Sequence, residues 1–184
     1  DLGTNLNTGA YKDSSLATLW KRVVSEKTAA FQDFAPYAPQ QNLPALFFGA
    51  PVWAENGEMP GVVVLQISLK EINALMSERE GLGATGETYL VGQDKRMRSD
   101  AFLDPEHRSI IASFRSQESG LTDTEAVRRG LAGETGVLAD FDYRGKPTLS
   151  AYTSVDELGM NWALLAEIDQ DEAFQGIVVL RNAV

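Results

Sequence analysis

The feature that most constrains the fold is a pattern that occurs twice in the chain. Residues 47–72 (FFGAPVWAENGEMPGVVVLQISLKEI) lie over residues 148–173 (TLSAYTSVDELGMNWALLAEIDQDEA), so that Glu71 falls on Glu172. Each copy has the composition of a strand, a turn, an apolar strand and the start of a helix. A repeat of this length predicts two related α+β modules with antiparallel sheets flanked by helices, and not a short-period solenoid.

The stretch between the two copies, residues 81–99 (GLGATGETYLVGQDKRMRS), has a glycine-rich start followed by a predicted hairpin. We expect strands at residues 87–91 and 96–99, joined by the turn Gly92-Gln93-Asp94-Lys95. The glycine-rich start is not followed by the Lys-Ser/Thr pair of a P-loop, and it precedes a strand where a P-loop precedes a helix. Both differences disfavour phosphate binding. We therefore interpret them as the joint between a first module at residues 1–80 and a second at residues 81–184.

The remaining elements follow from hydrophobic periodicity and turn residues. Helices are expected from Leu16 through Val24, capped by Asp13, Ser14 or Ser15, and at residues 69–76, 102–114, 125–131 and 171–182. Strands are expected at residues 31–34, 46–53, 61–67, 137–143, 147–153 and 161–168, with an irregular loop around Pro36, Pro39 and Pro44. The unbroken apolar run of residues 61–67 predicts burial on both faces.

The first module has no counterpart of the opening hairpin of the second. The chain also begins abruptly on a strand-like stretch and ends on an apolar run. We therefore expect a first module that is incomplete at its N-terminus, in a segment of a longer protein.

Charge and composition exclude several classes of partner. The formal net charge is −10, the pI is about 4.6 and the basic residues are scattered, which argues against nucleic acid and against an anionic membrane surface. The chain has no cysteine, so disulfides, thiolate metal sites and cysteine nucleophiles are excluded. It has no apolar run long enough for a transmembrane helix.

Several motifs, taken in order, resemble an extracytoplasmic double Cache sensor domain. The stretches similar to its second module are residues 83–100 (GATGETYLVGQDKRMRSD), 142–155 (DYRGKPTLSAYTSV) and 162–173 (WALLAEIDQDEA). Those similar to the latter part of its first module are residues 31–39 (FQDFAPYAP) and 47–76 (FFGAPVWAENGEMPGVVVLQISLKEINALM). The resemblance covers nearly the whole chain.

The resemblance implies two PAS-like modules along a long N-terminal helix, which this sequence lacks. Such domains serve chemotaxis receptors, sensor histidine kinases and nucleotide cyclases. It implies a small-molecule ligand, no cofactor, and a periplasmic position in an inner-membrane protein that forms a homodimer. The final helix would then lead toward a membrane span.

In the first module, the resemblance places a mostly apolar pocket between the sheet and the helices. The candidate ligand-binding residues are Asp33, Tyr37, Phe48 and Trp53, with Tyr11 and Trp20 on the helical side, although Phe48 and Trp53 suit an ordinary core equally well. Related amino-acid receptors carry an Arg-x-Trp-Tyr motif and an aspartate, where this chain has GAYKDSS and Gln66. That difference disfavours an α-amino acid and leaves a carboxylate, a purine, a polyamine or no ligand open.

In the second module, the candidates are Arg98 and Ser99 at the end of the hairpin, with Tyr89 and Tyr152 on neighbouring strands. An arginine that faces a pocket favours a small organic anion, because its guanidinium binds carboxylates in a bidentate manner. The alternative is that Arg98 pairs with a surface carboxylate. By resemblance the first module is the usual ligand site and the second transmits the signal; we keep both.

The sequence gives little support for catalysis. The one histidine, His107, lies in a polar stretch without a GxSxG motif, and no metal-ligand spacing is present. We expect a protein that is not an enzyme, with no catalytic residue and no metal. The alternatives are a structural or dimerisation module without a ligand and, less favoured, a hydrolase that uses His107.

Overall fold

The first helix begins where the sequence offers a cap. Helix α1 (Ser15–Glu26) is preceded by Ser14, whose hydroxyl accepts a hydrogen bond from the Ala17 amide at 3.2 Å. Its apolar face buries Leu19 and Val23 completely. The helix ends at Glu26 and is capped by Lys27, which adopts a left-handed conformation with φ 57°.

The computed structural model describes residues 3–115 and 120–175, which fall into two units that we describe separately. Unit 1 comprises Asp1–Ser68 with Glu157–Met160, and unit 2 comprises Leu69–Asp156 with Asn161–Val184. Unit 2 therefore begins at the first residue of helix α2.

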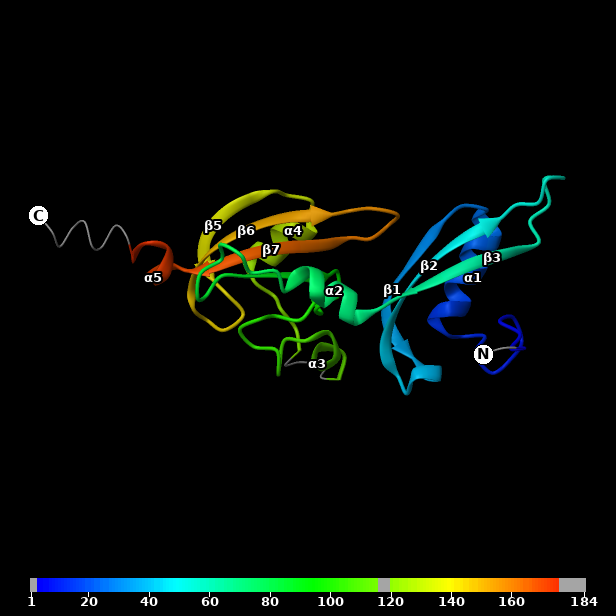
Figure 1. Cartoon of the computed structure of the whole chain (residues 1–184), viewed down its shortest axis with the longest axis horizontal. Coiled ribbons are helices and arrows are strands. Elements are labelled where there is room, and N and C mark those ends of the chain that lie inside the picture. Colours follow the sequence, from blue (N-terminus) through cyan, green and yellow to red (C-terminus); the bar gives the residue numbers. More distant parts are fainter. Residues whose placement is uncertain (1–2, 116–119, 176–184) are drawn as a thin grey trace, which may run out of the picture. The chain divides into compact units, whose positions relative to one another are not determined.

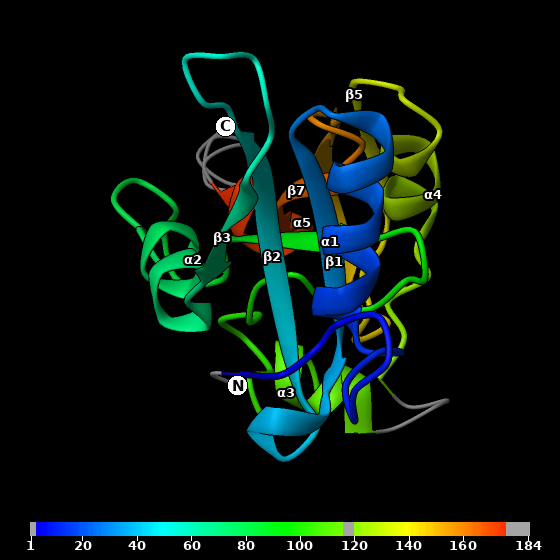
Figure 2. The ribbon, with the colours of Figure 1, turned by 90° about the vertical axis from the view of Figure 1, so that its right-hand side faces the viewer.

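Unit 1 is a three-stranded antiparallel sheet with α1 on one face (Figures 1 and 2). Its strands lie in the order β1 (Ala30–Tyr37), β2 (Leu43–Val52) and β3 (Gly61–Ile67), and the 3-10 helix η1 (Ala38–Gln40) joins the first two. Gly49 of β2 lies directly under α1, because a Cβ atom there would come within 3.1 Å of Leu19 and Val23. The helix therefore packs closely on the middle strand.

Two expectations for unit 1 are wrong. The region expected to be an irregular loop extends the sheet instead, because Pro36 and Pro44 lie opposite each other near the ends of β1 and β2. Strand β3 is half-buried on one face, through Val62 and Val64, and exposed on the other: Val63 and Leu65 are 57% and 61% exposed. The apolar run of residues 61–67 wrongly predicted burial on both faces, because α1 covers one face of the sheet and no described element of unit 1 covers the other.

Unit 2 has a four-stranded antiparallel sheet in the order β4-β7-β6-β5 (Figure 1). The elements, in chain order, are α2 (Leu69–Met76), β4 (Glu87–Gly92), α3 (Ile110–Arg115), α4 (Glu125–Leu131), β5 (Gly136–Phe141), β6 (Pro147–Val155), β7 (Trp162–Asp169) and α5 (Gln170–Ala173). Helix α4 is capped by the Thr124 side chain and packs on the sheet. Its Val127 joins Tyr89 and Leu165 in the core.

The expected hairpin at residues 87–99 is half right. Strand β4 is present, but residues 96–99 form only a single bridge between Val91 and Met97. The full partner of β4 is β7, which lies far along the chain. The helix expected at residues 102–114 is also mostly wrong, since only α3 forms and residues 101–109 make a loop.

The predicted α+β class with antiparallel sheets is confirmed. The repeated sequence pattern becomes β2-β3-α2 in unit 1 and its junction, and β6-β7-α5 in unit 2. None of the helices in the described part of the chain is long and apolar enough to span a membrane. The final helix expected at residues 171–182 lies mostly outside the described residues.

Candidate functional site

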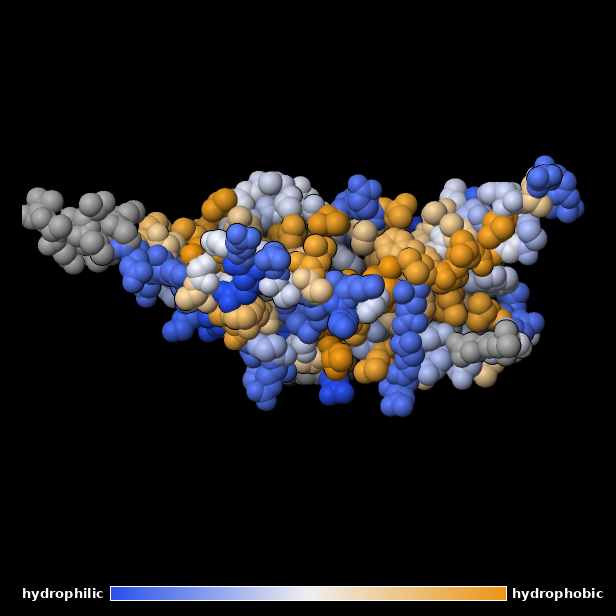
Figure 3. Space-filling view, in the orientation of Figure 1, coloured by the Kyte–Doolittle hydropathy of each residue, from blue (hydrophilic) through white to orange (hydrophobic). Residues whose placement is uncertain are grey.

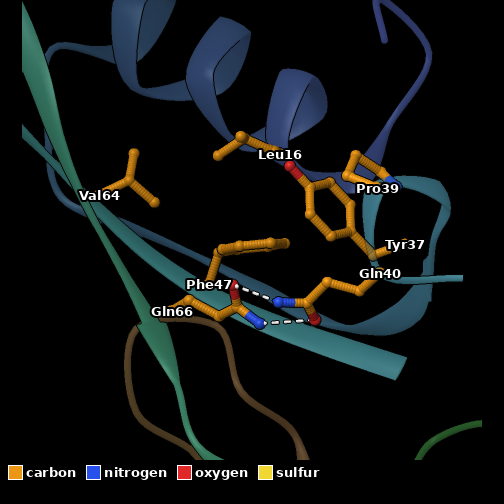
Figure 4. A pocket seen from close by; sticks show the side chains of 7 residues that line it. All are labelled: Leu16, Tyr37, Pro39, Gln40, Phe47, Val64 and Gln66. Atoms are coloured by element: carbon orange, nitrogen blue, oxygen red, sulfur yellow. Dashed lines mark hydrogen bonds between the residues drawn. The ribbon is translucent and has the colours of Figure 1, made fainter. Parts of the chain in front are cut away.

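Unit 1 contains a pocket between α1 and the face of the sheet that the helix covers (Figure 4). Its volume is about 420 Å³, within the usual range for small-molecule sites. The lining residues come from α1, η1 and all three strands: Leu16, Tyr37, Pro39, Gln40, Phe47, Val64 and Gln66. All of these lining residues belong to unit 1, so the fold of this one unit forms the pocket.

The alternation of side chains along β2 and β3 brings Phe47 and Gln66 to the pocket face. The two residues are paired across the strands, so both point to the same side of the sheet. Tyr37, at the end of β1, packs its ring against Phe47 edge to face, with ring centroids 5.1 Å apart. Burial, with a smaller effect of Tyr11, raises the pKa of the Tyr37 phenol, which therefore stays neutral at physiological pH.

Two glutamines meet at one side of the pocket. The Nε2 atom of Gln40 donates to Oε1 of Gln66 at 3.2 Å, and Nε2 of Gln66 donates back to Oε1 of Gln40 at 2.9 Å (Figure 4). The turn that presents Gln40 is held by Gln41 and Asn42, both left-handed with φ near 60°. The reciprocal amide pair joins η1 to β3, and both side chains remain exposed to solvent.

Unit 2 carries a second hollow, of about 360 Å³, on the sheet face opposite to α4. It is bordered by residues of β5, β6 and β7 and by the residue before β5: Thr135, Gly136, Val137, Ala151, Tyr152, Thr153, Leu164 and Ala166. Val137 is 70% exposed there. This hollow offers little hydrogen bonding, so it has less means of selecting a polar ligand than the unit 1 pocket.

The core of unit 2 holds a cross-strand pair of glutamates. Glu87 of β4 and Glu167 of β7 are register partners, with 1% and 5% of their surfaces exposed. Glu87 accepts from the Tyr143 hydroxyl at 2.6 Å and from the Leu103 amide at 3.1 Å. Oε1 of Glu167 accepts from the Ser150 hydroxyl at 2.7 Å, whereas its Oε2 is buried without a well-formed hydrogen bond. Burial raises the pKa of both carboxyls, that of Glu167 to about 7.

The connector between α2 and β4 is clamped from two sides. The Arg79 guanidinium donates to the carbonyl oxygens of Gly83, Ala84 and Gly86 at 2.9 to 3.2 Å. From the other side, the Glu172 carboxylate of α5 accepts from the amides of Ala84 and Thr85, both at 2.7 Å. Glu172 also accepts from the Thr85 hydroxyl, and this contact, followed by the two amide hydrogen bonds, lowers the pKa of Glu172. The connector thereby ties α2, which directly follows β3 in the chain, to α5.

The structure places one of the four candidates of the first module in the unit 1 pocket. Tyr37 lines it. Asp33 sits at a bulge of β1, where it accepts from the Phe34 amide at 2.7 Å. Phe48 packs against Phe31 on the opposite face, and Trp53 is half exposed beyond the end of β2. Their role in ligand binding remains a prediction.

The candidates of the second module do not share one cavity. Tyr89 and Tyr152 belong to the same buried core cluster, and Tyr152 also borders the unit 2 hollow. Arg98, only 2% exposed, binds Asp94 at 2.9 Å and the Arg96 carbonyl at 3.0 Å. Ser99 accepts from the Leu90 amide at 2.9 Å. Arg98 thus has a carboxylate partner within its own turn.

Sequence reasoning missed most of the pocket. Leu16, Pro39, Gln40, Phe47 and Val64 were not among the candidates, and Gln66 was noted only as a departure from related receptors. A signal was available in the alternation of β2, which puts Phe47 and Phe48 on opposite faces. The choice between the two faces depends on where α1 packs, and Gly49 under Leu19 and Val23 decides it.

The sequence also matches a known protein family. A model described as a Cache domain matches residues 6–177. The chain belongs to the Cache domain family. No curated protein matches its sequence.

Solved structures of chemoreceptor domains have folds similar to that of this chain. The ligand-binding domain of the Pseudomonas fluorescens chemoreceptor CtaA, in complex with L-leucine, aligns with TM-score 0.55 and 15% identity over 95% of this chain and 66% of its own. The periplasmic sensory domain of the Campylobacter jejuni chemoreceptor Tlp1 aligns with TM-score 0.60 and 13% identity over 84% of this chain and 55% of its own. The ligand-binding domain of the Pseudomonas aeruginosa receptor PctC, in complex with GABA, aligns with TM-score 0.54 and 18% identity over 92% of this chain and 65% of its own. The chain thus spans less than two thirds of each of these structures.

Two further observations concern chemistry. Within the described residues, no group of three or more His, Cys, Asp or Glu side chains is arranged to hold a metal ion. His107 is exposed in a loop, where its Nδ1 lies 2.8 Å from Asp104 Oδ1, and this contact raises the pKa of the imidazole. These two residues form a hydrogen-bonded pair at the surface.

Proposed function

We propose that this Cache chain is the small-molecule sensing part of a membrane-anchored receptor, and that the unit 1 pocket is its ligand site. The observation that carries the proposal is the built pocket between α1 and the sheet, which combines an aromatic floor with a convergent amide pair. The double Cache organisation, the periplasmic position and the homodimeric parent protein belong to the same proposal. The similar folds of the chemoreceptor domains support it.

The proposed signal begins at β3, which contributes Val64 and Gln66 to the pocket. A ligand that binds Gln66 favours one position of β3, and α2 follows that strand after a single residue. The Arg79 and Glu172 contacts then connect the residues after α2 to α5. Such a shift requires the ligand to bind one arrangement more tightly than the other.

A thermal-shift screen of the whole chain tests the sensing proposal. The panel contains amino acids, organic acids, amines, nucleobases and neutral amides. A ligand at one hundred times its Kd stabilises the folded state by about 2.7 kcal/mol, which is a readily measured change in Tm. The expected result is stabilisation by at least one compound.

Two neighbouring residues of β3 supply the control. Val64 lines the pocket, whereas Val63 points away from it and is 57% exposed. Val64→Phe fills the pocket and is expected to abolish the stabilisation, and Val63→Phe is expected to retain it. If no compound stabilises the protein, the pocket is not a sensor site and a structural or dimerisation role gains support. If Val64→Phe leaves the response intact, the ligand binds elsewhere.

A further inference from the structure

The side chains around the unit 1 pocket are uncharged. Of the described residues that line it, four are apolar, one is a neutral tyrosine and two are glutamines. A charged ligand that enters such a pocket loses hydration without gaining an opposite charge, which is costly. The pocket therefore selects against amino-acid zwitterions, dicarboxylates and polyamines alike.

The amide pair gives the pocket a specific hydrogen-bonding pattern. Each primary amide offers an N–H donor beside a carbonyl acceptor, and Gln40 and Gln66 currently satisfy each other in both directions. A ligand that carries an N–H next to a C=O in one rigid unit presents the same pattern. Such a ligand replaces Gln40 as the partner of Gln66 and keeps both hydrogen bonds of Gln66, while the exposed Gln40 amide binds water instead.

The aromatic floor favours a flat ligand. Tyr37 and Phe47 meet edge to face at an interplanar angle of 73°, and the ring of Phe47 lies beside the amide pair (Figure 4). A planar ring that binds the amide edge packs on this apolar surface. The arrangement thus places the aromatic ring of Phe47 beside a donor–acceptor edge.

We infer that the ligand of the unit 1 pocket is an uncharged, planar compound with a cyclic amide edge, of the lactam or nucleobase type, which Gln66 binds in place of Gln40. This inference rests on the proposed function and names the chemical class of its ligand. It assigns the amide pair a role in specificity, in place of a charged residue.

Calorimetric titration of the whole chain with defined probes tests the inference. Uracil and 2-pyrrolidone carry the amide edge, and 1,3-dimethyluracil keeps the uracil ring but has no N–H donor. L-leucine, succinate and putrescine represent zwitterions, anions and cations. We expect at least one of uracil and 2-pyrrolidone to bind and no charged probe to bind. If uracil binds, 1,3-dimethyluracil is expected to bind about tenfold more weakly, because it loses one or two hydrogen bonds.

Variants of the amide pair complete the test. Gln66→Leu is expected to weaken the binding of the amide probe about tenfold, whereas Gln93→Leu, the same change at an exposed glutamine of unit 2, leaves binding unchanged. Gln66→Glu places a carboxylate beside Gln40 and is expected to admit putrescine while weakening the amide probe. Both changed side chains are exposed, so the fold tolerates them.

The outcomes separate the two proposals. If neither uracil nor 2-pyrrolidone binds, or if Gln66→Leu binds the amide probe as well as the unchanged chain, the ligand class is wrong. If a charged probe binds and Val64→Phe abolishes that binding, the class is wrong but the sensing proposal stands. The sensing proposal itself fails only when the full thermal-shift panel gives no response that depends on Val64.

Discussion

The buried glutamate of β7 makes the stability of unit 2 depend on pH. Glu167 is 5% exposed, lies opposite Glu87, and has one carboxylate oxygen without a well-formed hydrogen bond. Burial raises its pKa from 4.5 to about 7, and the nearby Asp142 and Glu87 add to the effect. Between those two values the folded state holds a proton that the unfolded chain has lost.

The sign and the size of the effect follow from this difference. The stabilising contribution is fully present below pH 4.5 and is lost as the pH rises through about 7. The loss amounts to roughly 3 kcal/mol, a large fraction of the stability of a typical domain. The raised pKa of Glu87 acts in the same direction. Asp123 and Glu172 have lowered pKa values, so their stabilisation is lost only as the pH falls through more acidic values.

Glu167→Gln removes the titration and keeps the shape of the side chain. Its Oε1 still accepts from Ser150, and its new N–H₂ group faces the Tyr89 hydroxyl, which lacks a well-formed hydrogen bond. We expect the variant to equal the unchanged chain at pH 5 and to exceed it by up to about 3 kcal/mol at pH 8. Urea unfolding followed by circular dichroism measures both values.

The comparison controls for other groups in the same pH range. His107 also titrates with a raised pKa, but it is present in both proteins, so its contribution cancels in the difference. Glu78→Gln, at an exposed position of unit 2, is expected to follow the unchanged chain between pH 5 and 8. If Glu167→Gln retains the full loss of stability between pH 5 and 8, the assignment of the proton to this buried pair is refuted.

Three further predictions concern the packing and the clamps. Gly49→Ala is expected to lower the stability of unit 1 by about 1 to 3 kcal/mol, because its Cβ meets Leu19 and Val23 at 3.1 Å; Gly61→Ala, with open space around it, is the control in thermal melts. Ser14→Ala removes the cap of α1 and is expected to cost about 1 kcal/mol, and an unchanged melting temperature would contradict the capping role. Glu172→Gln is expected to speed amide hydrogen exchange at residues 84 and 85, because its side chain accepts hydrogen bonds from both amides. Glu80→Gln is the control. If these amides of the Glu172→Gln variant are as protected as those of the unchanged chain, Glu172 does not hold the connector.

Local sequence signals predicted much of the fold. The spacing of Leu16, Leu19 and Val23 behind a serine cap gave α1 correctly, and the paired apolar strands of unit 2 gave β6 and β7. These elements depend on contacts between residues near in sequence or on unbroken apolar runs. Their prediction therefore needed no knowledge of the partner.

The errors arose where a distant residue decides the local structure. The loop at residues 101–109 replaces the expected helix because Asp100 accepts from the Ile110 amide at 2.7 Å and is itself held by Asn73. The site candidates failed for a related reason. Phe47 and Phe48 are equivalent by composition, and only the position of α1 distinguishes the pocket face of β2 from the other face.

The central claim is that a small molecule binds in unit 1 between α1 and the sheet. Two-dimensional NMR of the labelled chain, titrated with the compound that gives the largest thermal shift, tests it most directly. The account predicts that the largest amide shifts fall at residues 16, 37, 40, 47, 64 and 66, which line the pocket. Shifts concentrated instead at residues 135–137, 151–153 and 164–166, around the unit 2 hollow, would contradict it.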